Sequence, residues 1–196
     1  MSKQLPLMRI KNHFLSKIFF LINVFFFKRL YWSSKVIDPA SVEGAQFISI
    51  GRETLIAKST AICASDIIEK NPELTIGNGV MIGKFNHIYA TKKIVIHDGV
   101  LTANNVYIAD NQHDYCDITK HIIEQPIVQK GTVEIGQGAW IGQNACIVGC
   151  SIGRNSVVGA GSLVIQDVPD YCVVAGVPAE IIKRYSFENK KWEKVE

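Results

Sequence analysis

A six-residue pattern runs through residues 135–168, which read IGQGAWIGQNACIVGCSIGRNSVVGAGSLVIQDV. An apolar residue leads each unit, glycine usually follows it, and a small residue stands at the fifth place. The leads are Ile135, Ile141, Ile147, Ile152, Val158 and Val164, with one shorter step after the third. A period of six matches neither the 3.6-residue helix nor the two-residue alternation of a simple strand. It predicts a solenoid whose coils are short flat strands that meet at tight corners.

The same pattern covers residues 50–108, where it is interrupted by two short slips. The leads there are Ile50, Ile56, Ile62, Ile76, Ile82, Ile88, Ile96 and Ile108. Slips are best tolerated at corners, where an extra residue disturbs little packing. Three units make a coil of about 18 residues, so residues 37–178 are expected to form about six or seven coils. Neighbouring coils bury one another's faces, and the two end coils therefore need a cover.

Two segments fall outside the pattern, and both are expected to be helical. Residues 179–196 are predicted to form a C-terminal helix or tail. Residues 1–36 contain the apolar run FLSKIFFLINVFFF, bounded by basic residues. This run is shorter than the roughly 20 residues that span a bilayer, and no small-residue cleavage site follows it. Two interpretations stay open: a helix packed on the coil's end or in an oligomer interface, or a peripheral membrane contact through residues 14–31.

Charge and cysteine content narrow the class of protein. The net charge is only +3, so no large basic field indicates nucleic-acid binding. The five cysteines are an odd number and show no C-x-x-C spacing, which favours reduced thiols in a cytosolic protein. No pair of histidines has the spacing of a metal site on one predicted face, so no metal is expected.

The longest interruption of the pattern is a loop at residues 109–132. It lies between the leads Ile108 and Ile135, and it carries His113 and His121, two of the five histidines in the chain. Long excursions from a regular scaffold are frequent places for function. The loop is therefore the first place to look for chemistry.

Several motifs resemble the hexapeptide-repeat acyltransferases. They are NQHDY at 111–115, WIG at 140–142, VVGAGSLV at 157–164, DVP at 167–169 and AGVPAEIIKR at 175–184. They look most like the sugar O-acetyltransferase branch, which includes galactoside, maltose and nodulation-factor acetyltransferases and the polysaccharide type. The resemblance implies an all-β, left-handed parallel β-helix, an exception to the usual right-handed crossover. It also implies a homotrimer that binds acetyl-CoA in grooves between subunits.

Three polar residues are candidates for the catalytic machinery. His113 matches the family's catalytic histidine, and an imidazole can take a proton from an attacking hydroxyl or amine near neutral pH. Asn86 matches a family asparagine near the reacting carbonyl, where it would bind acceptor or polarise the thioester. The alternative for Asn86 is a local corner hydrogen bond. Asp114 could orient the His113 ring, although a nearby carbonyl could do the same.

The resemblance also implies an acetyl-CoA groove. The residues expected to line it are Trp140, Gly142, Gln143, Ala160, Gly161 and Ser162. Lys183 and Arg184 are expected to pair with the CoA phosphates. Other family positions for the nucleotide end differ here, being occupied by Ile165, Gln166 and Glu180.

The favoured function is an acetyl-CoA-dependent O-acetyltransferase that acts on a sugar hydroxyl in surface polysaccharide or glycolipid biosynthesis. Its expected location is the cytoplasm, with contact at the inner membrane face left open. Alternatives are N-acetylation of a nucleotide-linked amino sugar and acetylation of an antibiotic. A non-catalytic β-helix or a carbonic anhydrase-like module is a further alternative, but the latter needs three metal-binding histidines that the pattern does not supply.

Overall fold

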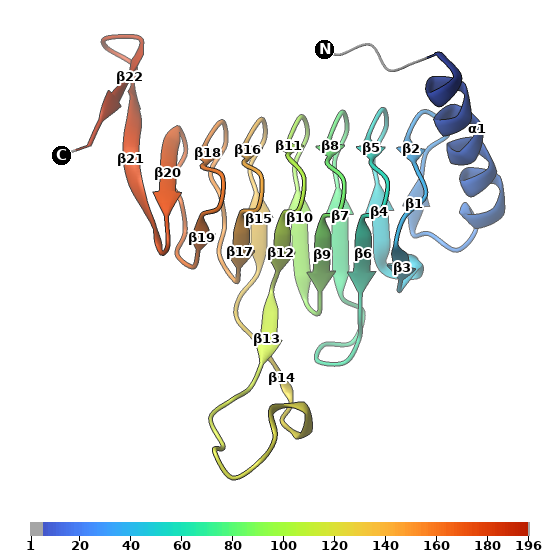
Figure 1. Cartoon of the computed structure of the whole chain (residues 1–196), viewed down its shortest axis with the longest axis horizontal. Coiled ribbons are helices and arrows are strands. Elements are labelled where there is room, and N and C mark those ends of the chain that lie inside the picture. Colours follow the sequence, from blue (N-terminus) through green and yellow to red (C-terminus); the bar gives the residue numbers. More distant parts are fainter. Residues whose placement is uncertain (1–5, 196) are drawn as a thin grey trace.

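A computed structural model describes residues 6–195 and shows a three-sided coil, with a helix at one end and a hairpin at the other (Figure 1). Each turn of the chain passes through sheets A, B and C in that order. Sheet A contains β1 (Arg29–Leu30), β4 (Ile48–Ile50), β7 (Glu73–Ile76), β10 (Lys93–Ile96) and β15 (Val133–Ile135). Sheet C contains β3 (Ser41–Glu43), β6 (Ala61–Ala64), β9 (His87–Ala90), β12 (Tyr107–Ala109), β17 (Cys146–Val148) and β19 (Leu163–Val164).

Sheet B is the longest of the three. Its parallel strands are β2 (Lys35–Val36), β5 (Leu55–Ile56), β8 (Met81–Ile82), β11 (Leu101–Thr102), β16 (Trp140–Ile141), β18 (Val157–Val158) and β20 (Cys172–Gly176). Two antiparallel strands follow, β21 (Ala179–Ser186) and β22 (Lys191–Lys194). Short 3-10 turns lie at η1 (Ala45–Phe47) and η2 (Ile122–Glu124).

The predicted leads form ladders of isoleucine inside the coil. Ile62 pairs in register with Ile88, which pairs with Ile108, which pairs with Ile147. All four side chains are fully buried. Each buried isoleucine contributes about 1.5–3 kcal/mol of hydrophobic stabilisation, so the ladders hold successive coils together. The solenoid of short strands that the six-residue pattern predicts is confirmed, and its strands pair in parallel, as the family resemblance implies.

The glycines that follow the leads serve close packing between coils. At Gly142 an added Cβ would lie 2.6 Å from the backbone nitrogen of Ala160 in the next coil. Gly161 differs, because its φ of 71° is in the left-handed region and the space around it is open. Glycine is therefore required for proximity at the first position and for backbone conformation at the second.

The prediction of a C-terminal helix is wrong, because residues 179–194 form the β21–β22 hairpin. Side chains of β21 alternate between half-buried and exposed along most of the strand, with the two-residue period of a strand. Tyr185 pairs in register with Trp192, and their rings are 5.5 Å apart. Strand β20 offers a free edge for β21, so pairing with this edge prevails over local helix propensity.

Helix α1 (Pro6–Asn23) lies at the other end of the coil, beside β2 (Figure 1). Its Phe19 packs against the core, and Phe27 just after it is buried within the core. The first strands, β1 and β2, begin inside the segment predicted as residues 1–36. Residues 1–5 of that segment and residue 196 lie outside the described residues. None of the helices described here is long and apolar enough to cross a bilayer.

Candidate active site

The loop at residues 109–132 contains a small antiparallel hairpin that carries His113. Strand β13 (Asn111–His113) pairs with β14 (Ile127–Gln129), and His113 is the register partner of Ile127. The hairpin and the irregular segment between its strands project from the coil on one side (Figure 1). His113 is exposed. The histidine that the sequence motif singled out is thus exposed to solvent on a short hairpin.

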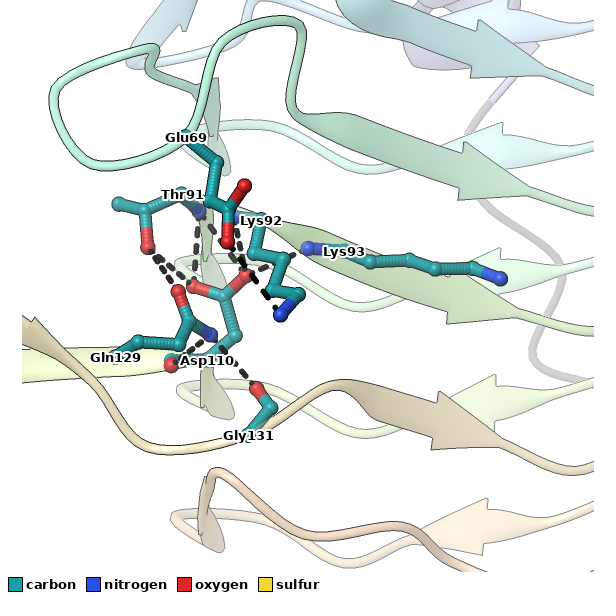
Figure 2. Close-up of polar contacts among 7 residues, drawn as sticks. All are labelled: Glu69, Thr91, Lys92, Lys93, Asp110, Gln129 and Gly131. Atoms are coloured by element: carbon teal, nitrogen blue, oxygen red, sulfur yellow. Dashed lines mark hydrogen bonds and ion pairs between the residues drawn. The ribbon is translucent and has the colours of Figure 1, made fainter.

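The base of this hairpin is tied to the preceding coil through Asp110, as Figure 2 shows. The Asp110 carboxylate is fully buried and accepts hydrogen bonds from the backbone N–H groups of Thr91, Lys92 and Lys93, the shortest from each at 2.8–2.9 Å. The Thr91 hydroxyl donates to the same carboxylate at 2.9 Å. Gln129 at the end of β14 donates its amide to the backbone oxygens of Asp110 and Gly131.

Asp114 follows His113 and holds the turn beyond it. Its Oδ1 accepts the backbone N–H groups of Tyr115 at 2.8 Å and Cys116 at 3.0 Å. The Cys116 thiol, with those backbone groups, lowers the pKa of the Asp114 carboxyl from its usual value. Among residues 6–195, no hydrogen bond joins Asp114 to His113. The observed contacts of Asp114 therefore order the loop.

Asn86 lies inside a corner between sheets B and C, where it is buried. Its Oδ1 accepts the Val106 backbone N–H at 2.6 Å, and its Nδ2 donates to the Thr102 hydroxyl. These contacts join two successive coils and satisfy a polar side chain that would be costly to bury alone. The corner hydrogen bond, one of the two readings of the sequence, is thus present.

Four of the predicted groove residues are exposed along one side and edge of the coil. Trp140 is 50% exposed on the outer face of sheet B, where its register partner is Val157. At the corner after sheet B, the backbone oxygen of Gln143 accepts the N–H of Gly161 at 2.8 Å, which places Gln143, Ala160 and Gly161 on neighbouring coils. These side chains are accessible to a thin ligand that runs along the coil axis.

The other two groove residues are buried in the coil itself. Gly142 packs against the backbone of the next coil, as described above. The Ser162 hydroxyl accepts the backbone N–H of Gly176 at 3.3 Å. Both residues shape the corner from inside, whereas Gln143, Ala160 and Gly161 form its surface.

The two predicted phosphate-binding residues lie on β21. Lys183 pairs with Val173, so the outer face of sheet B carries a row from Trp140 through Val157 and Val173 to Lys183. With strands about 4.8 Å apart, Lys183 is about 14 Å from Trp140 along the coil axis. The Arg184 guanidinium is 3.4 Å from the Cys172 sulfur. Ile165, Gln166 and Glu180 are exposed.

Within one chain, His113 and the groove are not brought together. The hairpin leaves the coil between β12 of sheet C and β15 of sheet A, whereas Gln143 and Gly161 lie at the corner between sheets B and C. The width of sheet C separates these two corners. The hairpin that carries the histidine and the groove of the same chain therefore lie at different corners of the coil.

The remaining histidines and the cysteines have ordinary surroundings. The His87 ring packs against Tyr89 and Tyr107, and His97 is 3.6 Å from a Glu134 carboxylate oxygen. All five cysteines, which lie within the described residues, are free thiols. In residues 6–195 no group of three or more His, Cys, Asp or Glu side chains could hold a metal ion.

The chain is similar to several known acetyltransferases. The chain is 35% identical over 124 residues to the putative lipopolysaccharide biosynthesis O-acetyl transferase WbbJ of Escherichia coli, which covers 60% of this chain and 63% of WbbJ. It is 32% identical over 150 residues to the galactoside O-acetyltransferase of E. coli, or 72% of each protein. No family model matches the chain.

Among solved structures, the chain is similar to AntD, an N-acyltransferase from Bacillus cereus crystallised with dTDP and 3-hydroxybutyryl-CoA. The TM-score is 0.72 at 19% identity, over 86% of this chain and 89% of AntD, which shows a shared fold. Fold and repeat together define a hexapeptide-repeat β-helix. On its identity to galactoside O-acetyltransferase, the chain belongs to the hexapeptide-repeat acetyltransferases. The aligned region spans less than two thirds of WbbJ.

Sequence reasoning missed the residues that hold the hairpin, namely Asp110, Thr91 and Gln129. A signal was present, because Thr91 and Asp110 each follow a buried alanine at the end of a strand in sheet C. A carboxylate next to a predicted core position needs a partner. That need points to polar groups in the neighbouring coil.

Proposed function

We propose that this protein is an acetyl-CoA-dependent O-acetyltransferase that acts on a sugar hydroxyl in surface polysaccharide or glycolipid biosynthesis. The observation that carries the proposal is His113, exposed on a hairpin anchored to a coil of the acetyltransferase family. WbbJ and galactoside O-acetyltransferase, whose names describe O-acetyl transfer, support the reaction type. The left-handed winding of the family is part of the proposal.

In the proposed reaction, His113 acts as general base. It takes the proton of the acceptor hydroxyl as the hydroxyl oxygen attacks the thioester carbonyl of acetyl-CoA. The tetrahedral intermediate collapses by breaking the carbon–sulfur bond, and the CoA thiolate receives the proton from the imidazolium. No covalent bond to the enzyme forms. Because a carbonyl oxygen gains negative charge in this step, a nearby amide such as that of Asn86 would stabilise it if it turned outward.

The thioester arm would lie along the coil beside Trp140, Gln143, Ala160 and Gly161. The small side chains at the last two positions leave the corner backbone accessible, and the Trp140 ring forms an apolar wall. Lys183 and Arg184, farther along the axis, supply positive charge for the nucleotide end of CoA.

The active site requires a second copy of the chain in this proposal. The hairpin that carries His113 leaves the coil at one corner, and the groove lies at another. The hairpin of a neighbouring copy would therefore complete each groove. A closed ring of three copies makes three equivalent sites from such head-to-tail contacts. The homotrimer expected from the family fits this requirement.

Mixing two inactive variants tests the shared site. The variant His113→Ala lacks the base, and Ala160→Trp fills the groove at an exposed corner position. Either variant alone is expected to be inactive. After joint refolding in equal amounts, about one quarter of the sites pair an intact hairpin with an intact groove, so activity returns to about that fraction. No recovery in mixed trimers would place base and groove in one chain.

The role of His113 is tested by thiol release from acetyl-CoA with a panel of sugars. We expect kcat to fall about 10²–10⁴-fold in His113→Ala while acetyl-CoA still binds. His121→Ala, another exposed histidine of the same loop, is the matched control and keeps wild-type turnover. A His113→Ala enzyme with near-normal kcat would refute the assignment. The panel includes amino sugars linked to nucleotides, so that amide formation would reveal N-acetylation instead.

Helix α1 supports a contact with the inner membrane surface. Its outward face carries an apolar stripe at helical spacing, formed by Leu7, Ile10, Phe14, Ile18 and Leu21, which are 37–81% exposed. From Pro6 to Ile37 the chain contains six lysines and arginines and no acidic residue. An apolar stripe flanked only by positive charge fits a surface of anionic lipid. Lipid-linked acceptors would be found at such a surface.

Sedimentation with lipid vesicles tests this contact. We expect binding to vesicles that contain phosphatidylglycerol, with weaker binding at high salt. The double variant Phe14→Glu, Leu21→Glu should lose it, whereas Ile67→Glu, at an exposed apolar residue elsewhere on the coil, should not. If the double variant instead separates assembled copies in the absence of lipid, the stripe is a protein interface and the membrane proposal fails.

A further inference from the structure

At the root of the hairpin, a single side chain, that of Asp110, accepts hydrogen bonds from several residues. We define the hairpin root as Asp110, Thr91 and Gln129 (Figure 2). Asp110 is completely buried, and an isolated buried carboxylate would be unstable without strong partners. No Lys or Arg side chain in the described part of the chain forms an ion pair with it. Its charge is instead met by hydrogen-bond donors.

Both carboxylate oxygens of Asp110 are used as acceptors. Oδ1 accepts the Thr91 backbone N–H at 2.8 Å, the Thr91 hydroxyl at 2.9 Å and the Asn111 amide at 2.9 Å. Oδ2 accepts the backbone N–H groups of Lys92 at 2.8 Å and Lys93 at 2.9 Å. An asparagine at this position would turn an NH₂ group toward donors on one of the two sides. The geometry therefore requires a carboxylate.

Asp110 also contacts both strands of the hairpin. Asp110 immediately precedes β13, and its backbone oxygen accepts the Gln129 side-chain amide at 2.7 Å and the Lys130 N–H at 2.8 Å from the returning strand. The Thr91 hydroxyl lies 3.1 Å from the Gln129 side-chain oxygen, which closes the network onto the previous coil. One buried group thus connects the coil, the outgoing strand and the returning strand.

His113 lies three residues beyond this junction. The hairpin has three paired positions on each strand, and a two-stranded hairpin alone is marginally stable in water. The direction in which the hairpin leaves the coil is therefore set at its root. A catalytic group displaced by about 1 Å can lose about 100-fold in rate.

We propose that Asp110 is a positioning residue, which fixes the angle of the β13–β14 hairpin so that the His113 imidazole reaches the acyl group held by a neighbouring copy. This inference rests on the proposed role of His113 as base. Asp110 itself touches no substrate. Its contribution is to hold the hairpin in the one orientation in which the base meets the thioester.

The principal test is Asp110→Asn, measured on the assembled full-length protein. We expect kcat to fall about 10–100-fold, with the KM for acetyl-CoA close to that of the wild type, because the groove is untouched. In hydrogen exchange, the amides of residues 111–113 and 127–129 should lose protection while sheet amides keep theirs. The control Asp98→Asn alters an exposed corner carboxylate that also accepts a backbone N–H, from Asn78 at 2.7 Å, and should keep wild-type kcat.

Milder variants at two other residues of the hairpin root protect the test against misfolding. Gln129→Leu frees the returning strand but leaves the bonds between Asp110 and Thr91 intact, so a smaller fall in kcat is expected. Thr91→Ser keeps the hydroxyl and should retain activity, whereas Thr91→Val removes it and should lose part of kcat. Wild-type kcat in a hairpin that has lost protection would overturn the proposal. So would equal losses of hairpin protection, sheet protection and kcat.

Failure of this inference can be told apart from failure of the proposed function. An inactive His113→Ala enzyme beside a fully active Asp110→Asn enzyme would leave the base assignment intact and remove the positioning role. A fully active His113→Ala enzyme would remove the base, whatever Asp110→Asn does.

Discussion

The coil and the loop at residues 109–132 place the same kinds of residue in opposite surroundings. Ile96 is 0% exposed in the coil, whereas Ile123 is 88% exposed in the loop. A residue of the coil pairs with an equivalent residue in each neighbouring coil, so contacts on both sides fix its position. A loop residue has no equivalent residue in the neighbouring coils. The comparison teaches that burial and stability come from repetition, and that side chains become exposed where repetition stops.

Cysteine reactivity should show the largest difference between the two regions. Burial, with Glu43 nearby, raises the pKa of the Cys63 thiol to about 12. At pH 8 a thiol with that pKa is ionised in about one molecule in 10⁴. The hydrogen bond with Asp114 also raises the pKa of the Cys116 thiol, but Cys116 is exposed in the loop. We expect a maleimide to modify Cys116 at least about 100-fold faster than Cys63, as followed by mass spectrometry of peptides.

Unfolding provides the control for the thiol experiment. In denaturant the two cysteines should react at similar rates, because burial no longer separates them. Slow labelling of Cys116 in the native protein would break the comparison, and it would place the loop tip against another copy of the chain.

Truncation of matched isoleucines should give the next largest contrast. Ile96→Ala removes part of a fully buried ladder and is expected to lower the free energy of unfolding by about 2–5 kcal/mol. Ile123→Ala removes an exposed side chain and should change it by less than about 0.5 kcal/mol. Urea titration measures both values, and a large effect at Ile123 would mean that the loop is packed in the assembly.

Two threonines sharpen the comparison at the level of single hydrogen bonds. The buried Thr60 hydroxyl donates to the Gly83 carbonyl at 2.8 Å across coils, while the exposed Thr119 hydroxyl donates to Asp117 at 2.6 Å within the loop. Thr60→Val should lower the free energy of unfolding by about 1–2 kcal/mol, because a buried acceptor loses its donor. Thr119→Val should cost far less, and equal losses in thermal denaturation would contradict the distinction.

Surface ion pairs should contribute equally little to the free energy of unfolding in the coil and in the loop. Lys58 and Asp38 on the coil are 3.0 Å apart, as are Lys120 and Asp117 in the loop, and all four side chains are well exposed. Solvent screens both pairs, so Lys58→Ala and Lys120→Ala should each change the free energy of unfolding by less than about 1 kcal/mol. A coil pair that proves much stronger in salt-dependent unfolding would show that repetition also organises the surface.

The fold was largely predictable because each isoleucine of the repeat meets a copy of itself. The six-residue period therefore contains both the local strand and the long-range contact, as in Ile62, Ile88 and Ile108. Residues 179–194 lack that period. Their strands form because β20 has a free edge, which no local pattern contains.

The candidate site was predictable only in part. The motif around His113 and the small residues near Gly161 could be found from the sequence alone. The partners of Asp110 could not, because Thr91 and Gln129 are 19 residues away on either side and are joined by the geometry of the coil. The corner bonds of Asn86 likewise depend on residues of the next coil.

The antiparallel hairpin β21–β22 has a consequence for how this protein behaves at high concentration. A stack of identical coils with bare ends would offer each end as a template for another molecule, and head-to-tail growth into filaments would follow. Strand β21 reverses direction against β20, so sheet B cannot continue in parallel register. Within the described residues, the parallel pairing of sheet B thus ends at β20, and the β21–β22 hairpin covers that edge.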